Sequence, residues 1–206
     1  MGRVLNVSPI AVDAGALEAL RWERLFGNDN PVEVEIGTGK GGFLLDRARA
    51  HPERNFLGIE WANRYFRFAA DRLRRWNVSN VRMARVDADH FFRVLCPRDS
   101  VSALHVYHPD PWPKKRHHKR RLFKPVFVDA AVACLVEGGR LAVQTDHAEY
   151  YHVIRQLLLG HPELAETNFD DPQFVADSGR IASNFELKYA REGRQIYRLA
   201  VVRRKR

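Results

Sequence analysis

The chain has 206 residues, of which 45% are apolar and 29% charged, and its formal net charge is +9. This composition excludes a disordered chain and is enough to bury a substantial core. We expect one domain over residues 1–206, with a helical extension at 1–30 and a basic tail at 203–206. The positive charge favours a polyanionic partner, with nucleic acid before an acidic membrane surface.

Cysteine usage and hydropathy indicate the expected cellular location of the protein. The two cysteines, Cys96 and Cys134, have no metal-like spacing, and so few in a chain of this length indicate a reducing environment. No apolar segment reaches the roughly 18 residues of a membrane span, and the amino terminus has no signal-peptide core. We therefore expect a cytoplasmic protein without a membrane partner.

Apolar runs alternate with helix-spaced stripes along the chain. Expected strands cover residues 32–36, 55–59, 81–86, 101–106, 140–144, 164–169 and 195–202. Expected helices cover 43–50, 62–77, 123–136 and 147–159, after a short helix around Leu17 to Leu25. Gly138 and Gly139 are expected to end the helix at 123–136 in a left-handed cap. The alternation predicts an α/β fold, a doubly wound, mostly parallel seven-stranded sheet with helices on both faces.

A glycine-rich loop follows the first of these strands. Gly37, Gly39 and Gly42 have G-x-G-x-x-G spacing, while Gly37, Gly39 and Gly41 fit G-x-G-x-G. Such a turn lets a cofactor lie against the backbone near a helix amino terminus. Glu60 ends the next strand, where a carboxylate can accept both hydroxyl hydrogens of a ribose. These features fit NAD and S-adenosylmethionine equally well.

Three further acids favour one of the two cofactors. Glu35 precedes the glycine loop, Asp87 ends the third strand and Asp110 follows the fourth. A ring of carboxylates suits a cationic sulfonium cofactor that also carries an amino group, and it would repel a pyrophosphate. Lys40 in the loop could bind a phosphate, so NAD remains an alternative and S-adenosylmethionine is favoured.

The segment that follows the fourth strand, YHPDPWPKKRHHKRR at 107–121, combines a rigid acid with many cations. Pro109 and Pro111 restrict the backbone and remove two donors, so Asp110 is expected on a stiff loop at the carboxyl edge of the sheet. Residues 112–124 carry seven Lys or Arg residues and no acid. We interpret the segment as a base-binding pocket beside a phosphate-binding track.

Taken together, these motifs resemble the bacterial tRNA (guanine-N7-)-methyltransferases. The shared motifs occur in the family's order between residue 32 and about 193, at Glu35–Gly41, Gly58–Glu60, Asp87–Ala88, Pro109–His117, Lys119–Arg121 and Thr145–Asp146. The resemblance implies a Rossmann-like class I methyltransferase fold. It also implies methylation of N7 of guanine-46 in the variable loop of tRNA, which yields 7-methylguanosine and S-adenosylhomocysteine.

The resemblance further assigns site residues. Asp110 would be catalytic and would contact S-adenosylmethionine together with Glu35, Gly37, Gly39, Gly41, Glu60 and Asp87. Substrate contacts would come from Lys114, Asp146, Ser183, Asn184, Phe185 and Glu186, and RNA contacts from Arg116, His117, His118, Lys119, Arg120 and Arg121. Ser183 and Asn184 replace the family's threonine and basic residue, and His108 stands where phenylalanine is common.

Guanine N7 carries a free lone pair, so its methylation requires orientation rather than removal of a proton. We expect acids such as Asp110 to orient the base or to stabilise the cationic product. Rival hypotheses are an NAD-dependent oxidoreductase, a non-catalytic RNA-binding protein, and a zinc protein using His105, His108, His117 and His118. No cysteine or acid spacing completes a zinc site, so no metal is expected. The expected partner is tRNA, with no obligate protein partner and a monomeric or homodimeric state.

Overall fold

A computed structural model describes residues 5–171 and 192–205. These residues form an eight-stranded sheet in the order β1-β4-β3-β2-β5-β6-β8-β7. Strand β8 runs antiparallel to β6 and β7, and the other neighbouring pairs are parallel. The strands are β1 (Ala11–Val12), β2 (Val32–Ile36), β3 (Asn55–Ile59), β4 (Val81–Ala84), β5 (Val101–Tyr107), β6 (Leu135–Thr145), β7 (Leu164–Thr167) and β8 (Tyr197–Arg203).

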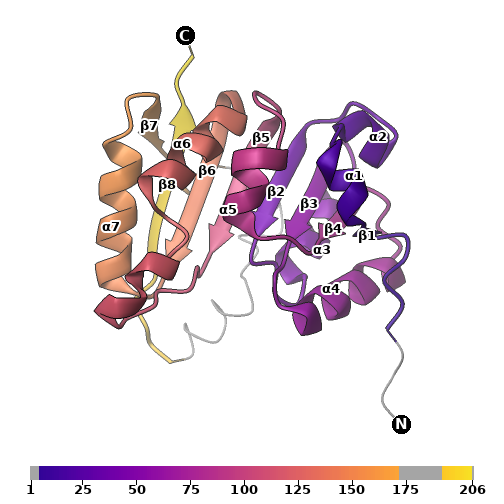
Figure 1. The fold of residues 1–206 in the computed structure, drawn as a ribbon, viewed down its shortest axis with the longest axis horizontal. Coiled ribbons are helices and arrows are strands. Elements are labelled where there is room, and N and C mark those ends of the chain that lie inside the picture. The colour runs from indigo at the N-terminus through magenta and orange to yellow at the C-terminus, as the bar shows by residue number, and fades with distance from the viewer. Residues whose placement is uncertain (1–4, 172–191, 206) are drawn as a thin grey trace.

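Helices cover both faces of this sheet (Figure 1). They are α1 (Ala14–Glu18), α2 (Trp22–Phe26), α3 (Gly42–Ala50), α4 (Asn63–Arg75), α5 (Ala88–His90) with a π-helical turn (Phe91–Leu95), a 3-10 helix (Lys115–Arg120), α6 (Pro125–Cys134) and α7 (Ala148–Leu159). The expected doubly wound, mostly parallel α/β fold is confirmed. The prediction of seven strands did not include β1, which has only two residues and pairs with β4.

Two apolar clusters lie on opposite faces of the sheet. The larger cluster packs α1, α2, the π-helical turn, α6 and α7 against residues such as Val34 and Leu104. The smaller cluster packs α3 and α4 against Phe56 and Met83. Neighbouring residues of one strand divide between the clusters, as Phe56 and Leu57 do, because successive side chains of a strand point to opposite faces.

The prediction of a glycine cap after α6 was wrong. The helix ends at Cys134, and Leu135 already pairs with Val101 of β5. The pairing then shifts register and resumes at Arg140, so both glycines lie within β6. Gly138 has a φ of 75°, and a Cβ on Gly139 would lie 2.8 Å from the Val136 carbonyl oxygen. These glycines therefore permit an irregular strand rather than a helix end.

The chain ends differ in part from the expected extension and tail. The segment before β2 contains two short helices and β1, and its Leu17 and Trp22 are buried in the core. Arg203, expected in a basic tail, is the last residue of β8 and is buried beside Asp99 and Glu163. Its guanidinium therefore contributes to the fold and not to a free positive tail.

The strand order reverses between β2 and β5, and in open α/β sheets ligands bind outside the carboxyl ends of the strands at such a point. Figure 1 shows β2, β5 and β6 ending at the same lower edge of the molecule. The helix α4 lies on one side of this edge, and the 3-10 helix Lys115–Arg120 lies on the other side.

Candidate active site

The glycine loop joins the end of β2 to α3. Gly37, Gly39 and Gly41 have φ values of 78°, 56° and 70°, a region that side chains with a Cβ rarely adopt. The Gly37 backbone N–H donates to the Ile59 carbonyl at 2.8 Å, which holds the loop against the end of β3. A Cβ on Gly41 would lie 3.1 Å from the Ala69 side chain of α4. Because the loop glycines have no side chains, α3 and α4 can approach the ends of β2 and β3 closely.

Glu60 binds this loop from the end of β3. Its Oε2 accepts a hydrogen bond from Gly39 N at 2.8 Å, and its Oε1 accepts one from Ala62 N at 2.8 Å. The side chain thus connects the glycine loop to the start of α4. Each carboxylate oxygen has a second lone pair, so Glu60 can still accept ribose hydroxyl hydrogens at this edge.

Glu35 is the buried acid of the site. Burial raises its pKa, and the neighbouring charge of Glu60 raises it further, to about 8. Its Oε2 has no hydrogen-bond partner in the described structure. An unpaired buried polar atom costs free energy, whereas a cationic group beside it would both ionise and satisfy the carboxyl. This arrangement fits a positively charged ligand such as S-adenosylmethionine.

The strand expected to end at Asp87 ends at Ala84, so Asp87 lies three residues beyond β4, where it is exposed. Its Oδ1 accepts a hydrogen bond from His90 N at 2.9 Å and caps α5. This hydrogen bond holds the carboxylate near the edge of the sheet, because an N-cap side chain accepts from the first turn of its helix.

The loop after β5 carries Asp110 between two residues with positive φ. His108 has a φ of 54° and Trp112 a φ of 42°, values that are uncommon outside glycine. The His108 backbone N–H donates to the Gln144 carbonyl at 2.7 Å, so the loop leaves the sheet beside β6. Asp110 itself is exposed. Strained backbone of this kind is found where a side chain is held for a function.

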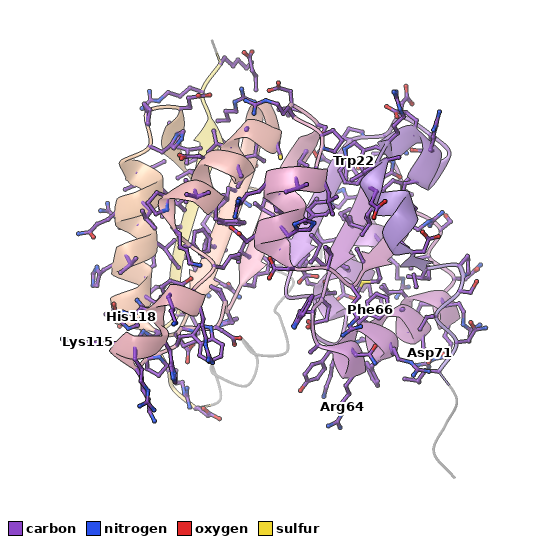
Figure 2. All side chains as sticks on the ribbon, in the orientation of Figure 1. Trp22, Arg64, Phe66, Asp71, Lys115 and His118 are labelled. Carbon is purple, nitrogen blue, oxygen red and sulfur yellow. The ribbon has the colours of Figure 1, made fainter. Side chains whose placement is uncertain are left out.

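The residues expected to bind RNA divide into two groups. Arg116, Lys119 and Arg120 are exposed on the 3-10 helix together with Lys115, while His117 and His118 are half-buried. The guanidinium of Arg120 lies 5.0 Å from the Trp112 ring, and the His117 ring packs edge-on to the same indole. Figure 2 shows Lys115 and His118 at the lower edge of the molecule.

Arg121 differs from this group because it is buried. Its Nε donates to the Pro111 carbonyl at 2.8 Å, and its two terminal nitrogens bind Glu149 of α7. The guanidinium also lies over the Tyr150 ring, 4.6 Å from its centroid. These contacts inside the protein support the Asp110 loop, and the RNA contact of Arg121 stays a prediction.

Asp146 follows β6 on the same edge. Its Oδ2 accepts a hydrogen bond from Arg194 at 3.0 Å, and its Oδ1 lies 3.7 Å from His108 Nδ1. Lys114, the other predicted substrate contact in this region, is exposed. The predicted substrate residues Ser183, Asn184, Phe185 and Glu186 lie outside the described residues.

Comparison with known proteins identifies the family. A family model described as "Putative methyltransferase" matches residues 29–199, most of the chain. The chain is 36% identical, over 182 residues, to the tRNA (guanine-N(7)-)-methyltransferase of Alkalilimnicola ehrlichii, covering 88% of this chain and 76% of that protein. The chain belongs to this methyltransferase family.

Solved structures support the same fold. An S-adenosylmethionine-dependent O-methyltransferase of Thermotoga maritima matches with a TM-score of 0.55 and 17% identity, over 87% of this chain and 61% of that one. The chain thus spans less than two thirds of that enzyme. An rRNA methylase of Streptococcus thermophilus matches with a TM-score of 0.55 and 12% identity, over 86% of this chain and 89% of that one. The expected class I methyltransferase fold is confirmed.

A buried polar network behind the site of this methyltransferase was not predicted. Glu33, two residues before Glu35, accepts hydrogen bonds from Arg47 at 2.8 and 3.0 Å and from Arg54 at 3.0 Å. It also lies 2.8 Å from His105 Nε2, and His105 Nδ1 lies 3.1 Å from the Tyr107 hydroxyl. The available signal was a second glutamate inside an otherwise apolar strand, which requires buried partners.

The ionisation of Glu33 follows from this network. Burial opposes its charged form, but the hydrogen bond from His105 and the charges of His105, Arg47 and Arg54 outweigh burial and lower its pKa to about 2. Glu33 and Glu35 therefore carry different charges at neutral pH, although they point to the same face of one strand.

No helix among residues 5–171 and 192–205 is long and apolar enough to cross a membrane.

Proposed function

We propose that this protein transfers a methyl group from S-adenosylmethionine to N7 of a guanine in tRNA, at guanine-46 of the variable loop. The observation that carries the proposal is the convergence of four acids on one edge. Glu35, Glu60, Asp87 and Asp110 stand at or just beyond the ends of β2, β3, β4 and β5, which are neighbours in the sheet. The proposal also draws on the tRNA specificity named for the Alkalilimnicola relative.

Three of the four acids have distinct roles toward the donor. Glu60, fixed by two backbone N–H groups, would bind the ribose hydroxyls, and the glycine loop would lie along the donor's backbone. Glu35 would ionise and bind the amino group, because its buried oxygen has no other partner. Asp87, beyond the end of β4, would accept hydrogen bonds from other polar groups of the donor. When bound, the donor supplies an electrophilic methyl group on a positively charged sulfur.

Asp110 is the proposed catalytic residue. Guanine N7 has a lone pair and no proton to lose, so the residue has no general-base role. Its carboxylate would accept hydrogen bonds from the guanine N1–H and exocyclic amine and hold N7 in line with the methyl group. The base becomes cationic as the methyl group arrives, and a fixed carboxylate nearby stabilises that charge. Asp146 would assist from the end of β6.

Substrate RNA would be bound by exposed cations beside this loop. A stacked guanine must leave its stack to reach the sheet edge, at a cost of a few kcal/mol. Phosphate contacts from Lys115, Arg116, Lys119 and Arg120 would offset this cost, with Lys114 closest to the Asp110 loop in the chain. We propose a cytoplasmic enzyme that needs no protein partner and is a monomer or homodimer, which sedimentation of the purified protein would decide.

Product analysis tests this function. Purified protein is incubated with unmodified tRNA and methyl-labelled S-adenosylmethionine, and the nucleosides are separated by liquid chromatography and mass spectrometry. The proposal predicts labelled 7-methylguanosine, mapped to guanine-46 by nuclease fragments. Label in another nucleoside, or no label together with calorimetric binding of NADH, would overturn it and favour a different modification or the oxidoreductase hypothesis.

A further inference from the structure

Helix α4 and its neighbours Trp61 and Arg85 present an exposed face of aromatic rings and arginines. Of the six large apolar side chains that are exposed in the described residues, three lie between residues 61 and 68, namely Trp61 (64% exposed), Tyr65 (43%) and Phe68 (40%). Arg64 and Arg67 are exposed between them, and Arg85 lies over the Trp61 ring at 5.7 Å from its centroid. We call these six residues the aromatic–arginine face.

The packing of α4 does not require this face. The helix contributes Phe66, Ala69, Ala70 and Leu73 to the core, and these residues are nearly or fully buried. Tyr65 and Phe68 occupy the outer side, where an unpartnered ring leaves apolar surface in water. Exposed apolar groups that are clustered in this way mark interaction sites more often than single exposed residues do.

The charges of α4 are also arranged unevenly. Toward its carboxyl end, Arg74 and Arg75 form ion pairs with the buried Asp71. Toward its amino end, the first turn has no acid, and Arg64 and Arg67 have no ion pair within the described chain. Cations are unfavourable near a helix amino terminus, where the backbone dipole is positive. The helix dipole therefore does not account for Arg64, which lies in the first turn, and an anionic partner would account for both exposed arginines.

The position of the face indicates which anion it binds. Figure 2 shows Arg64 at the lower edge of the molecule, the edge that also carries Lys115 and His118. Figure 1 places α4 and the 3-10 helix on opposite sides of the strand ends. An RNA that inserts a base at the Asp110 loop and contacts the 3-10 helix would extend toward α4. Arginines bind its phosphates, and aromatic rings stack on unpaired bases.

We infer that the aromatic–arginine face is a second tRNA-binding surface, which contacts an unpaired stretch of the same tRNA on the side of the strand ends opposite the 3-10 helix. This inference rests on the proposed function. It assigns phosphate contacts to Arg64 and Arg67 and base stacking to Tyr65 and Phe68. Trp61 is kept out of the test because it adjoins Glu60 of the donor site.

The two kinds of contact are separable by salt. In tRNA titrations at several salt concentrations, Arg64→Gln and Arg67→Gln should each lower the slope of log affinity against log salt by about 0.7–0.9, the effect of removing one phosphate-binding cation. Tyr65→Ala and Phe68→Ala should each weaken binding roughly 5- to 100-fold and leave the slope unchanged. Arg24→Gln is the matched control, since Arg24 is an exposed arginine on α2 at the opposite edge.

Each variant is first checked for thermal unfolding and for S-adenosylhomocysteine binding, which should match the unsubstituted protein. Unchanged tRNA affinity and slope in all four substitutions would overturn the inference while leaving the proposed function intact, provided that the unsubstituted protein forms 7-methylguanosine. A loss of dimer in sedimentation without a change in tRNA binding would also overturn it, since the face would then join two copies of this chain. Failure of the unsubstituted protein to methylate tRNA would instead refute the proposed function.

Discussion

Arg121 and Glu149 form a bidentate ion pair that fastens the Asp110 loop to α7. The Nη1–Oε1 distance is 3.0 Å and the Nη2–Oε2 distance is 2.5 Å. Because Arg121 Nε also donates to the Pro111 carbonyl, a single guanidinium joins the loop backbone to the helix. The hydrogen bond from Arg121 also lowers the pKa of Glu149, which favours the ionised carboxylate. Although Arg121 belongs to a basic run, its guanidinium thus binds groups of the protein itself.

Replacing Arg121 should impair the chemical step more than RNA binding. In Arg121→Gln the Pro111 carbonyl and Glu149 lose their shared partner, so the Asp110 loop is no longer held in one position. Misplacement of a reacting group by about 1 Å lowers rates by up to about 100-fold. We expect kcat for tRNA methylation to fall about 10- to 100-fold while the salt dependence of tRNA binding is unchanged.

Lys119→Gln is the matched control for that experiment, because Lys119 is exposed two residues away. It should lower the salt slope by about 0.7–0.9 and leave kcat nearly unchanged. The assignment of Arg121 fails if Arg121→Gln lowers the salt slope as Lys119→Gln does and retains a normal kcat.

Glu35 should release a proton when the donor binds. Burial and the charge of Glu60 raise its pKa to about 8, so it is mostly protonated at pH 7 in the ligand-free protein. A cationic amino group beside it favours the ionised form, and affinity should therefore increase between pH 6 and pH 8. Calorimetry with S-adenosylhomocysteine in buffers of different ionisation enthalpy should detect close to one proton released at pH 7.

In Glu35→Gln that proton release and the pH dependence should disappear. Proton release that persists unchanged in Glu35→Gln would assign it to another group and remove Glu35 from the donor site. Thermal unfolding of the ligand-free variant checks that its fold is intact.

Glu33→Gln should destabilise the fold. The substitution leaves Arg47 buried without its counter-ion, a change that costs about 3–5 kcal/mol. The pKa of Glu33 is lowered to about 2 from 4.5, so its contribution is present above pH 4.5 and is lost as the pH falls toward 2. Urea unfolding should therefore show a gap between the variant and the unsubstituted protein that narrows below about pH 4.5.

Glu53→Gln is the control for Glu33, since Glu53 contacts Arg54 and His51 at the surface. Exposed ion pairs contribute about 0–1 kcal/mol, so this substitution should have little effect. Equal destabilisation by the two substitutions would contradict the account of the buried network.

Asp110→Asn should abolish methylation without unfolding the protein. The amide keeps the shape of the side chain but presents an N–H group where the base needs an acceptor, and it carries no charge to stabilise the cationic product. We expect turnover to fall at least about 100-fold, measured by transfer of labelled methyl groups, with an unchanged melting temperature. A near-normal rate would remove Asp110 from the catalytic role.

Much of the fold could be predicted because its signals are local. Strand β2 was predicted at residues 32–36 and β3 at 55–59, and both were found with these bounds. Helix α4 was predicted two residues too long at its carboxyl end, where Arg75 is its last residue. The short strand β1 depends on pairing with β4, a contact between residues far apart in sequence, and two residues carry no pattern of their own.

The placement of candidate site residues at the sheet edge was predictable where residue type and position coincide, as for Glu60 after β3 and Asp110 after β5. The role of Arg121 was not predictable, because its partner Glu149 is 28 residues away and the flanking Lys119 and Arg120 are exposed cations of the same kind. The Glu33 network was missed for a similar reason. Its partner His105 lies on β5, and only the strand order shows that β2 and β5 are adjacent.

The most direct test of the central claim is a crystal structure of the protein with S-adenosylhomocysteine. The account predicts the ligand at the carboxyl ends of β2 to β5, with its ribose hydroxyls on Glu60, its amino group within hydrogen-bond distance of Glu35 and its sulfur facing the Asp110 loop. Ligand bound away from this edge, or with neither Glu35 nor Glu60 in contact, would contradict the account.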